Sequence, residues 1–236
     1  MFKIEKPELW WTRELSGKDR QPLYTVSAVL TAKEKELDRT EKRVGLRTIE
    51  LNRERDPYGM NFQFRLNGVP LFIKGSNLIP PDSFITRFDD KKLEALLDAA
   101  QFANLNMLRV WGGGYYASDA FYDACDRRGL LVWQDFGFAC QAYPFFLPEF
   151  LENVKTEVHA QVQRLCHHPS LAVWCGNNEI EDMHMAWVHM QSMCSGRKNS
   201  FMRSWSRKFG RRIRTRPTPP VRRWALPITR AFTATM

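Results

Sequence analysis

The sequence predicts an α/β fold: the first half of a TIM (β/α)8 barrel, preceded by the end of a β-sandwich domain. Within residues 59–190, four apolar runs of strand length alternate with amphipathic helix patterns. Polar residues follow each run, whereas residues 1–58 are dominated by strand patterns. Residues 191–236 resemble neither part, and we expect a basic, disordered or out-of-frame tail.

Residues 1–58 are predicted to form the C-terminal part of the sandwich. Pro22–Leu30 and Val44–Leu51 are rich in the β-branched and aromatic residues that favour strands. The charged segment Lys33–Lys42 between them suits a solvated hairpin or loop. Because two or three strands do not close a sandwich, we expect the trailing edge of a domain whose start is absent.

The barrel part begins with two strand–helix units. Leu71–Lys74 is predicted as the first strand, and Met107–Trp111 is a second strand that stops at three glycines. Asp89 or Asp90 is expected to cap the helix between them, because apolar residues follow at helical spacing. These apolar residues are Leu93, Leu96, Leu97 and Ala100.

Two more strands continue the pattern. Ser118 is expected to cap a helix that ends near Gly129, and Leu130–Trp133 is predicted as the third strand. A longer helical stripe precedes the fourth strand, Leu171–Cys175. The stripe consists of Leu151, Val154, Val158, Val162 and Leu165. Units repeated at this spacing imply right-handed crossovers and a parallel sheet.

Polar or aromatic residues stand at the end of every predicted strand. Chemistry in parallel α/β folds is located at the carboxyl ends of the strands, so residues at four successive ends indicate one rim and favour a barrel over a flat doubly wound sheet. A structural ion pair for Arg109 and a core position for Trp111 are the alternatives. No Gly-x-Gly-x-x-Gly or P-loop motif indicates a nucleotide. The rim candidates are Asn77, Arg109, Trp111, Asp135, Asn178 and Glu179.

The run Leu171–Glu179 is the most informative stretch of the chain. An apolar strand breaks at Gly176 and then presents two amides and a carboxylate. Glu179 is therefore a candidate general acid/base, flanked by amides that can hold a hydroxylated ligand. The alternative on spacing alone is that Asn177 or Asn178 caps a helix whose first turn contains Glu179.

The composition places limits on the class of protein. With 44% hydrophobic and 26% charged residues the chain is expected to be globular through most of its length, and no apolar run approaches the ~18 residues of a membrane span. The first residues lack the pattern of a signal peptide. Five cysteines without Cys-x-x-Cys spacing argue against a metal or redox site, so we expect no metal and no cofactor.

The positive net charge of +9 belongs to the tail. All 26 acidic residues lie at or before Asp182, whereas 12 of the 35 Lys and Arg residues lie between Arg197 and Arg230. Arginines interleaved with aromatic residues could hold RNA, DNA or an anionic surface, although an unselected, solvated tail is favoured because no domain pattern supports binding. Nucleic acid is therefore not the expected partner.

Several runs together resemble glycoside hydrolase family 2, and within it the β-mannosidases. The resemblance covers roughly residues 7–190, and the Arg-Val-Trp-Gly-Gly-Gly and Gly-Asn-Asn-Glu motifs are specific in combination. It implies that the N-terminal part ends an immunoglobulin-like domain and that the next part begins a catalytic barrel. The matching runs are Pro7–Trp11, Arg43–Leu51, Arg65–Asp82, Asn106–Gly114, Leu131–Phe136 and Trp174–Glu179.

The resemblance also implies roles for the rim residues. Glu179 is similar to the acid/base that protonates the glycosidic oxygen, and Asn178 to the asparagine that binds the sugar 2-hydroxyl. Trp111 is similar to a tryptophan that walls the sugar subsite, and Arg109 to the arginine that orients the nucleophile. Asp135 is expected to support the rim. The implied reaction is retaining hydrolysis of terminal β-D-mannose residues from the non-reducing ends of glycans.

The sequence departs from that family at both ends. The nucleophile of the family comes from the second half of the barrel, which this chain does not reach, so we expect a fragment or aberrant product that is inactive alone. A catalytically dead fragment whose Arg-rich tail binds nucleic acid or an anionic surface is the alternative. The expected partner is an oligosaccharide or glycoprotein glycan with terminal β-mannose, without a membrane. Lysosomal residence follows only from the resemblance to animal enzymes.

Overall fold

The computed structural model describes residues 4–180. The predicted tail, residues 191–236, lies outside the described residues. The structure therefore does not test the alternative that this tail binds nucleic acid or an anionic surface. Within residues 4–180, no helix is long and apolar enough to cross a membrane.

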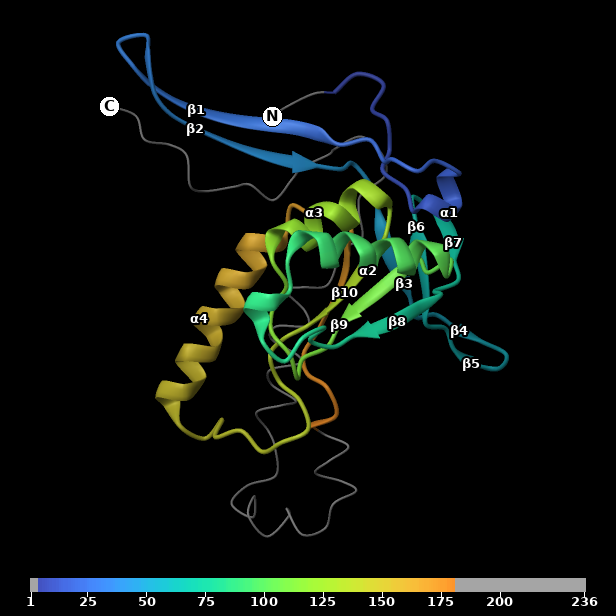
Figure 1. The fold of residues 1–236 in the computed structure, drawn as a ribbon. Helices are drawn as coiled ribbons and strands as arrows, with labels where there is room; N and C mark the ends of the chain where they lie inside the picture. The colour runs from blue at the N-terminus through green and yellow to red at the C-terminus, as the bar shows by residue number, and fades with distance from the viewer. Residues whose placement is uncertain (1–3, 181–236) are drawn as a thin grey trace.

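A four-stranded parallel sheet forms the centre of the described structure (Figure 1). Its strands are β8 (Gly75–Leu78), β9 (Met107–Val110), β10 (Leu131–Asp135) and β11 (Leu171–Cys175), in the order β11-β10-β9-β8. All neighbouring strands are parallel. The prediction of four successive parallel strands is therefore confirmed, and their carboxyl ends share one edge of the sheet.

Two helices cover one face of this sheet (Figure 1). In α2 (Asp90–Phe102), the Asp89 side chain caps the N-terminus by accepting from the backbone N–H of Lys92 at 2.9 Å, as predicted. Ser118 precedes α3 (Asp119–Arg128) at the predicted cap position, but its side chain makes no capping hydrogen bond. The two helices and the sheet share a buried core with Leu165, the last residue of the helix that precedes β11. This core consists of Leu93, Leu97, Ala100, Leu108, Val110, Phe121, Tyr122, Ala124, Cys125, Leu130, Val132, Leu165 and Leu171.

The long helix α4 (Pro148–Leu165) follows the predicted stripe closely. Val154, Val158 and Leu165 are buried, and Val162 packs against the same apolar groups as Val154. The helix begins with a proline in its first turn, where the missing N–H costs nothing. A stripe at helical spacing was therefore sufficient to place this element.

The predicted first strand of the barrel part, Leu71–Lys74, is wrong. Leu71 instead ends β7 (Val69–Leu71), which pairs antiparallel with β6 (Gln63–Leu66), and the parallel sheet begins only at β8. The Asn106 side chain accepts from Lys74 N–H and donates to Phe72 C=O, both at 2.8 Å. A remote amide thus satisfies the backbone at this step, and strand pairing resumes after it.

The N-terminal part contains a long hairpin, β1 (Tyr24–Ala32) with β2 (Lys35–Val44). The solvated hairpin predicted at Lys33–Lys42 is therefore present: its first two residues form the turn and the others are exposed strand residues of β2. The predicted strand Val44–Leu51 is interrupted, because β2 ends at Val44 and β3 (Ile49–Asn52) starts later. Both faces of β2 are exposed, so the charged sequence gives no alternation signal.

Smaller elements complete the described chain. A one-turn helix, α1 (Arg13–Ser16), precedes the hairpin, and β3 joins β6 and β7 in a three-stranded antiparallel sheet. The remaining elements are the short hairpin β4 (Arg55–Asp56) with β5 (Gly59–Met60) and the 3-10 helix η1 (Ile85–Arg87).

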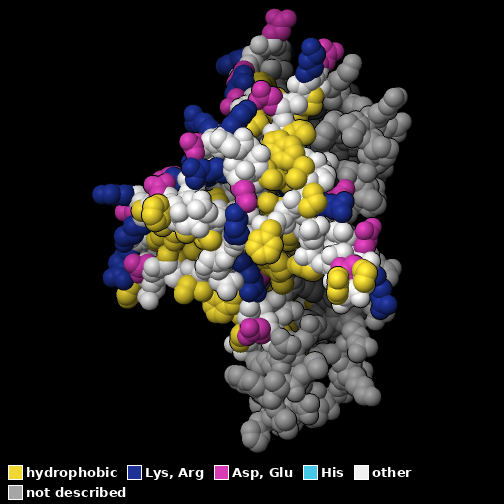
Figure 2. Space-filling view, turned by 90° about the vertical axis from the view of Figure 1, so that its right-hand side faces the viewer, with side chains coloured by type: hydrophobic (Ala, Val, Ile, Leu, Met, Phe, Trp, Pro, Cys, Tyr) yellow, Lys and Arg dark blue, Asp and Glu magenta, His cyan; other side chains and the backbone are white. Residues whose placement is uncertain are grey.

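Apolar side chains also reach the surface. Phe62, Phe72 and Phe102 are 59%, 82% and 91% exposed. The view in Figure 2 shows hydrophobic side chains gathered near the middle of one face, bordered by charged groups of both signs. Large apolar groups therefore face solvent in the part of the chain that the structure describes.

Contacts at the amino ends of the parallel strands attach the N-terminal part to the sheet. The fully buried Trp10 donates from its indole nitrogen to Asp126 C=O at 2.7 Å. Arg47 donates to the backbone carbonyls of Pro169 and Leu171, at 2.9 and 2.6 Å. These bonds fix the end of the sheet opposite to the carboxyl edge.

Candidate active site

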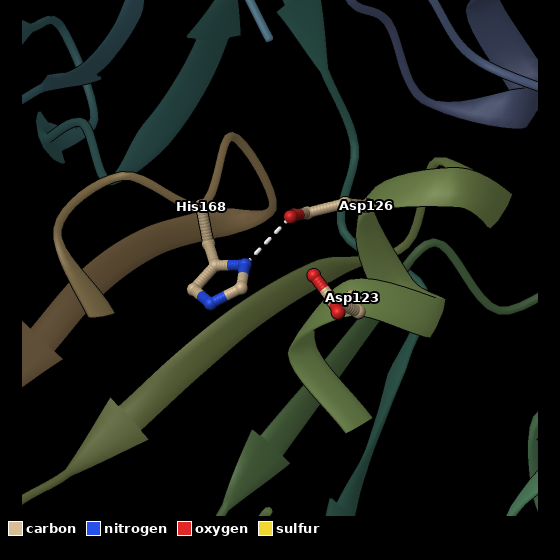
Figure 3. Close-up of side chains that lie close together, drawn as sticks. All are labelled: Asp123, Asp126 and His168. Carbon is tan, nitrogen blue, oxygen red and sulfur yellow. Dashed lines mark hydrogen bonds and ion pairs between the residues drawn. The ribbon is translucent and has the colours of Figure 1, made fainter. Parts of the chain in front are cut away.

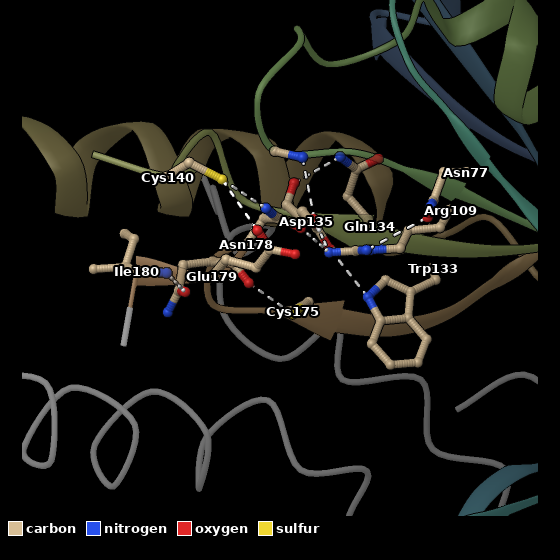
Figure 4. Close-up of polar contacts among 12 residues, drawn as sticks. Asn77, Arg109, Trp133, Gln134, Asp135, Cys140, Cys175, Asn178, Glu179 and Ile180 are labelled. Atoms are coloured by element: carbon tan, nitrogen blue, oxygen red, sulfur yellow. Dashed lines mark hydrogen bonds and ion pairs between the residues drawn. The ribbon is translucent and has the colours of Figure 1, made fainter. Parts of the chain in front are cut away.

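Arg109 is the centre of a polar cluster at the carboxyl edge of the sheet (Figure 4). Its guanidinium donates to both carboxylate oxygens of Asp135, at 3.2 and 2.7 Å. It also donates to the side-chain oxygens of Asn178, at 2.8 Å, and Asn77, at 3.4 Å. Residues from all four strand ends therefore meet at one arginine, as expected for a single rim. The structural ion pair considered for Arg109 is also present, and it is part of this cluster.

Asp135 is held by four donors and has little freedom. Its side chain is fully buried, and besides Arg109 it accepts from the indole nitrogen of Trp133 at 3.0 Å and from Gly112 N–H at 3.1 Å. Gly112 has no space for a side chain, since an added Cβ would lie 2.5 Å from Phe136 C=O. The carboxylate therefore fixes Arg109 and the turn after β9, and it is not free to attack a ligand.

Asn178 and Glu179 follow β11 in a segment tied to the loop after β10. Asn178 N–H donates to Phe138 C=O at 2.9 Å, and Cys140 N–H donates to Asn178 C=O at 3.1 Å. The Asn178 side chain is buried beneath the rim, whereas Glu179 is exposed and has a left-handed backbone with φ of 56°. A fixed amide thus lies beside a carboxylate that an incoming ligand can reach.

The capping alternative is partly visible in the same segment. The Asn177 side chain accepts from Ile180 N–H at 3.1 Å, the contact that a capping residue makes. Whether a helix continues lies outside the described residues. The contact involves Asn177 and leaves the Asn178 and Glu179 side chains in the polar cluster, so capping and a site are compatible.

Cys140 belongs to the site, although the sequence did not indicate it. Its sulfur accepts from the Asn178 side-chain nitrogen at 3.3 Å and donates to a Glu179 carboxylate oxygen at 3.4 Å (Figure 4). Desolvation and the hydrogen bond to Glu179 raise the pKa of the Cys140 thiol above its ordinary value. The only available signal was its position in the loop that follows the third strand.

Trp111 lies apart from this hydrogen-bonded cluster. It comes directly after β9 and lines an apolar cavity of about 110 Å³ together with Pro80, Phe88 and Phe121. Its ring also lies over Gly113, where an added Cβ would be 1.9 Å from a ring carbon. The predicted contact of Trp111 with a sugar stays a prediction.

A second cluster of titratable side chains lies at the amino ends of the strands (Figure 3). His168 and Asp126 are buried and joined by a 2.6 Å hydrogen bond, and the second Asp126 oxygen accepts from Ser170 N–H at 3.0 Å. Asp123 forms an ion pair with Arg43 at 2.8 Å. These three side chains are near enough for a metal ion. His168 Nδ1, both Asp126 oxygens and Asp123 Oδ2 already have protein partners, whereas the buried His168 Nε2 has none, so we interpret the cluster as structural.

The geometry at the rim suits proton transfer to a hydroxylated ligand. Glu179 presents a reachable carboxyl group, and the neighbouring Asn178 oxygen is held in place by a buried ion pair. Preorganised polar groups of this kind orient a ligand without reorganising when it reacts. The described residues thus place a reachable carboxyl group beside a fixed amide, an arrangement that suits proton transfer and ligand orientation.

Comparisons with known proteins relate this chain to glycoside hydrolases. The family described as glycosyl hydrolases family 2 matches residues 1–47. β-Mannosidase B of Aspergillus niger is 43% identical over 178 residues, which are 75% of this chain and 21% of that protein. β-Mannosidase of Bos taurus is 41% identical over 224 residues, 90% of this chain and 24% of that protein.

Solved structures show the same fold. The β-D-mannosidase of Dictyoglomus thermophilum aligns with a TM-score of 0.70 and 46% identity, covering 75% of this chain and 21% of that one. The exo-chitosanase of Amycolatopsis orientalis aligns with a TM-score of 0.62 at 23% identity, which supports the fold alone. The chain spans about a fifth of the length of the first relatives that it matches.

Proposed function

We propose that this chain, a partial homologue of the β-mannosidases of glycoside hydrolase family 2, carries the acid/base half of a retaining exo-β-mannosidase site. The substrate would be a glycan, free or on a glycoprotein, and the reaction would remove terminal β-D-mannose from its non-reducing end. One observation carries the proposal: Glu179 is exposed at the carboxyl edge of the sheet, beside an Asn178 amide that Arg109 holds.

The proposed reaction assigns each group a step. Glu179 protonates the glycosidic oxygen as the bond to the leaving group breaks, and then removes a proton from the water that completes hydrolysis. Asn178 binds the sugar 2-hydroxyl, and its orientation is supported by the contact between its oxygen and Arg109 at 2.8 Å. Trp111 is proposed to wall the sugar subsite, and Asp135 supports the rim through Arg109.

A retaining mechanism requires a second carboxylate about 5–5.5 Å from the acid. Asp135 does not fit that role, because its side chain is buried and its two oxygens accept four hydrogen bonds. We propose that the nucleophile comes from sequence beyond the described residues. Because residues 183–236 contain no Asp or Glu, the 236-residue polypeptide assayed alone is expected to be inactive.

The same resemblance supports proposals for architecture and location. Residues 59–190 are proposed to be the first half of a TIM barrel, and residues 1–58 the end of an immunoglobulin-like domain. The parallel order of β8 to β11 and the antiparallel β1–β2 hairpin support this division. Lysosomal residence is proposed from the likeness to the animal enzyme alone.

The test uses a chimera in which residues 4–180 replace the aligned segment of the Dictyoglomus thermophilum enzyme. In it, Glu179→Gln should lower the glycosylation rate on β-mannosides with poor leaving groups by about 10²–10⁴-fold, because the amide donates no proton to the leaving oxygen. Activated aryl β-mannosides need little acid assistance and should lose much less. Glu152→Gln, an exposed site on α4, is the matched control. Equal losses for both substrate classes would exclude Glu179 as the acid.

A further inference from the structure

The loop after β10 places a thiol between two site residues. Phe138–Cys140 runs alongside the segment after β11, and a parallel bridge joins Ala139 to Asn178. This pairing brings the Cys140 sulfur within 3.3 Å of the Asn178 side-chain nitrogen and 3.4 Å of a Glu179 oxygen. Cys140 is therefore in contact with both groups that the proposed reaction uses.

Two contacts fix the orientation of the Asn178 amide. Its oxygen accepts from Arg109, and its nitrogen donates to the Cys140 sulfur. Rotating the amide by 180° would turn its NH₂ group toward the guanidinium and leave both groups with donors only. Cys140 thus favours the rotamer in which the Asn178 oxygen stays on Arg109.

We propose that Cys140 is a positioning residue of this site, accepting from Asn178 while its S–H group donates to Glu179. The catalytic part of this inference rests on the proposed function, whereas the contacts do not. One side chain would then set the spacing between the acid/base and the amide that binds the neighbouring sugar hydroxyl. A misplacement of about 1 Å in such groups can cost about 10²-fold in rate.

The protonation state of the sulfur is consistent with this role. Desolvation and Glu179 raise the pKa of the thiol, so Cys140 keeps its proton at neutral pH and can donate it in a hydrogen bond. A thiolate would instead repel the carboxylate.

The contact can be tested on the full 236-residue chain without any enzymatic activity. Alkylation by iodoacetamide, followed site by site with mass spectrometry, reports the thiolate fraction of each cysteine. Glu179→Gln removes the neighbouring negative charge that raises the pKa of the Cys140 thiol, and should raise the Cys140 rate at pH 7.5 by about threefold. Cys166, an exposed thiol at the C-terminal cap of α4, should not change. An unchanged Cys140 rate would overturn the contact.

The positioning role is tested in the chimera. Cys140→Ala should lower the glycosylation rate on substrates with poor leaving groups by about tenfold and spare activated aryl β-mannosides. Cys140→Ser, which keeps a donor and an acceptor, should restore most of that rate. A merely structural role would slow both substrate classes equally, and that outcome would overturn the proposal. If the proposed function itself fails, Glu179→Gln shows no dependence on the leaving group, while the alkylation result still decides whether the contact exists.

Discussion

Replacing Asp135 by asparagine should destabilise the sheet edge strongly, although the two side chains have the same shape. Each carboxylate oxygen accepts two hydrogen bonds, one from Arg109 and one from either Trp133 or Gly112. Whichever oxygen becomes an NH₂ group, two donors lose their acceptor. Removing one partner of a buried ion pair typically costs about 3–5 kcal/mol. Because the Arg109 side chain is 27% exposed and water can replace part of the loss, we expect about 3 kcal/mol.

Urea unfolding of the full chain, followed by tryptophan fluorescence, measures this cost. Hydrogen exchange at Gly112 is a local readout, since its N–H donates to Asp135 at 3.1 Å and should exchange faster in the variant. Glu152→Gln, which removes an exposed charge partner of Lys155, should change the free energy of unfolding by less than about 0.5 kcal/mol. A cost below about 1 kcal/mol for Asp135→Asn, with unchanged exchange, would refute the view that this carboxylate holds the rim.

Two further predictions concern the scaffold. Gly129→Ala should lower the free energy of unfolding in urea by about 2 kcal/mol more than Gly17→Ala. Both glycines have a left-handed backbone, but only at Gly129 would an added Cβ meet backbone atoms, the nearest at 2.6 Å. Equal losses in the two variants would contradict this reasoning. Burial and His168 lower the pKa of His167 below 6.5, so the unfolded state binds more protons and stability should fall as pH drops below about 6.5. His167→Gln should reduce the loss of unfolding free energy between pH 7.5 and 5.5. An unchanged pH dependence of this free energy would argue against a contribution from His167.

The elements that were predicted correctly are those with local signals. The Asp89 cap and the apolar spacing after it define α2, and a short apolar run between turn residues defines β11. The first strand of the sheet was misplaced because Leu71–Lys74 has the same local pattern. Its pairing is decided by Asn106, which is more than thirty residues away in the chain.

Part of the candidate site could also be predicted from the sequence. Parallel strands bring their carboxyl ends together, so Arg109, Asp135 and Asn178 could be grouped from their positions at strand ends. Cys140 could not, because its contacts depend on a bridge between Ala139 and Asn178 that has no local signal. The direction of the Trp111 ring could not be predicted either. Trp111 follows the end of β9, and the alternation of side chains between the two faces of a sheet applies only within a strand.

The stereochemistry of azide rescue in the chimera tests the role of Glu179 as acid/base most directly. With Glu179→Ala and an activated aryl β-mannoside, the nucleophile still forms the glycosyl-enzyme, and azide can enter on the face that the missing acid/base has vacated. We expect faster turnover with azide and a β-mannosyl azide product. An α-mannosyl azide would identify Glu179 as the nucleophile, and an absence of rescue in an active, folded variant would contradict its role as acid/base.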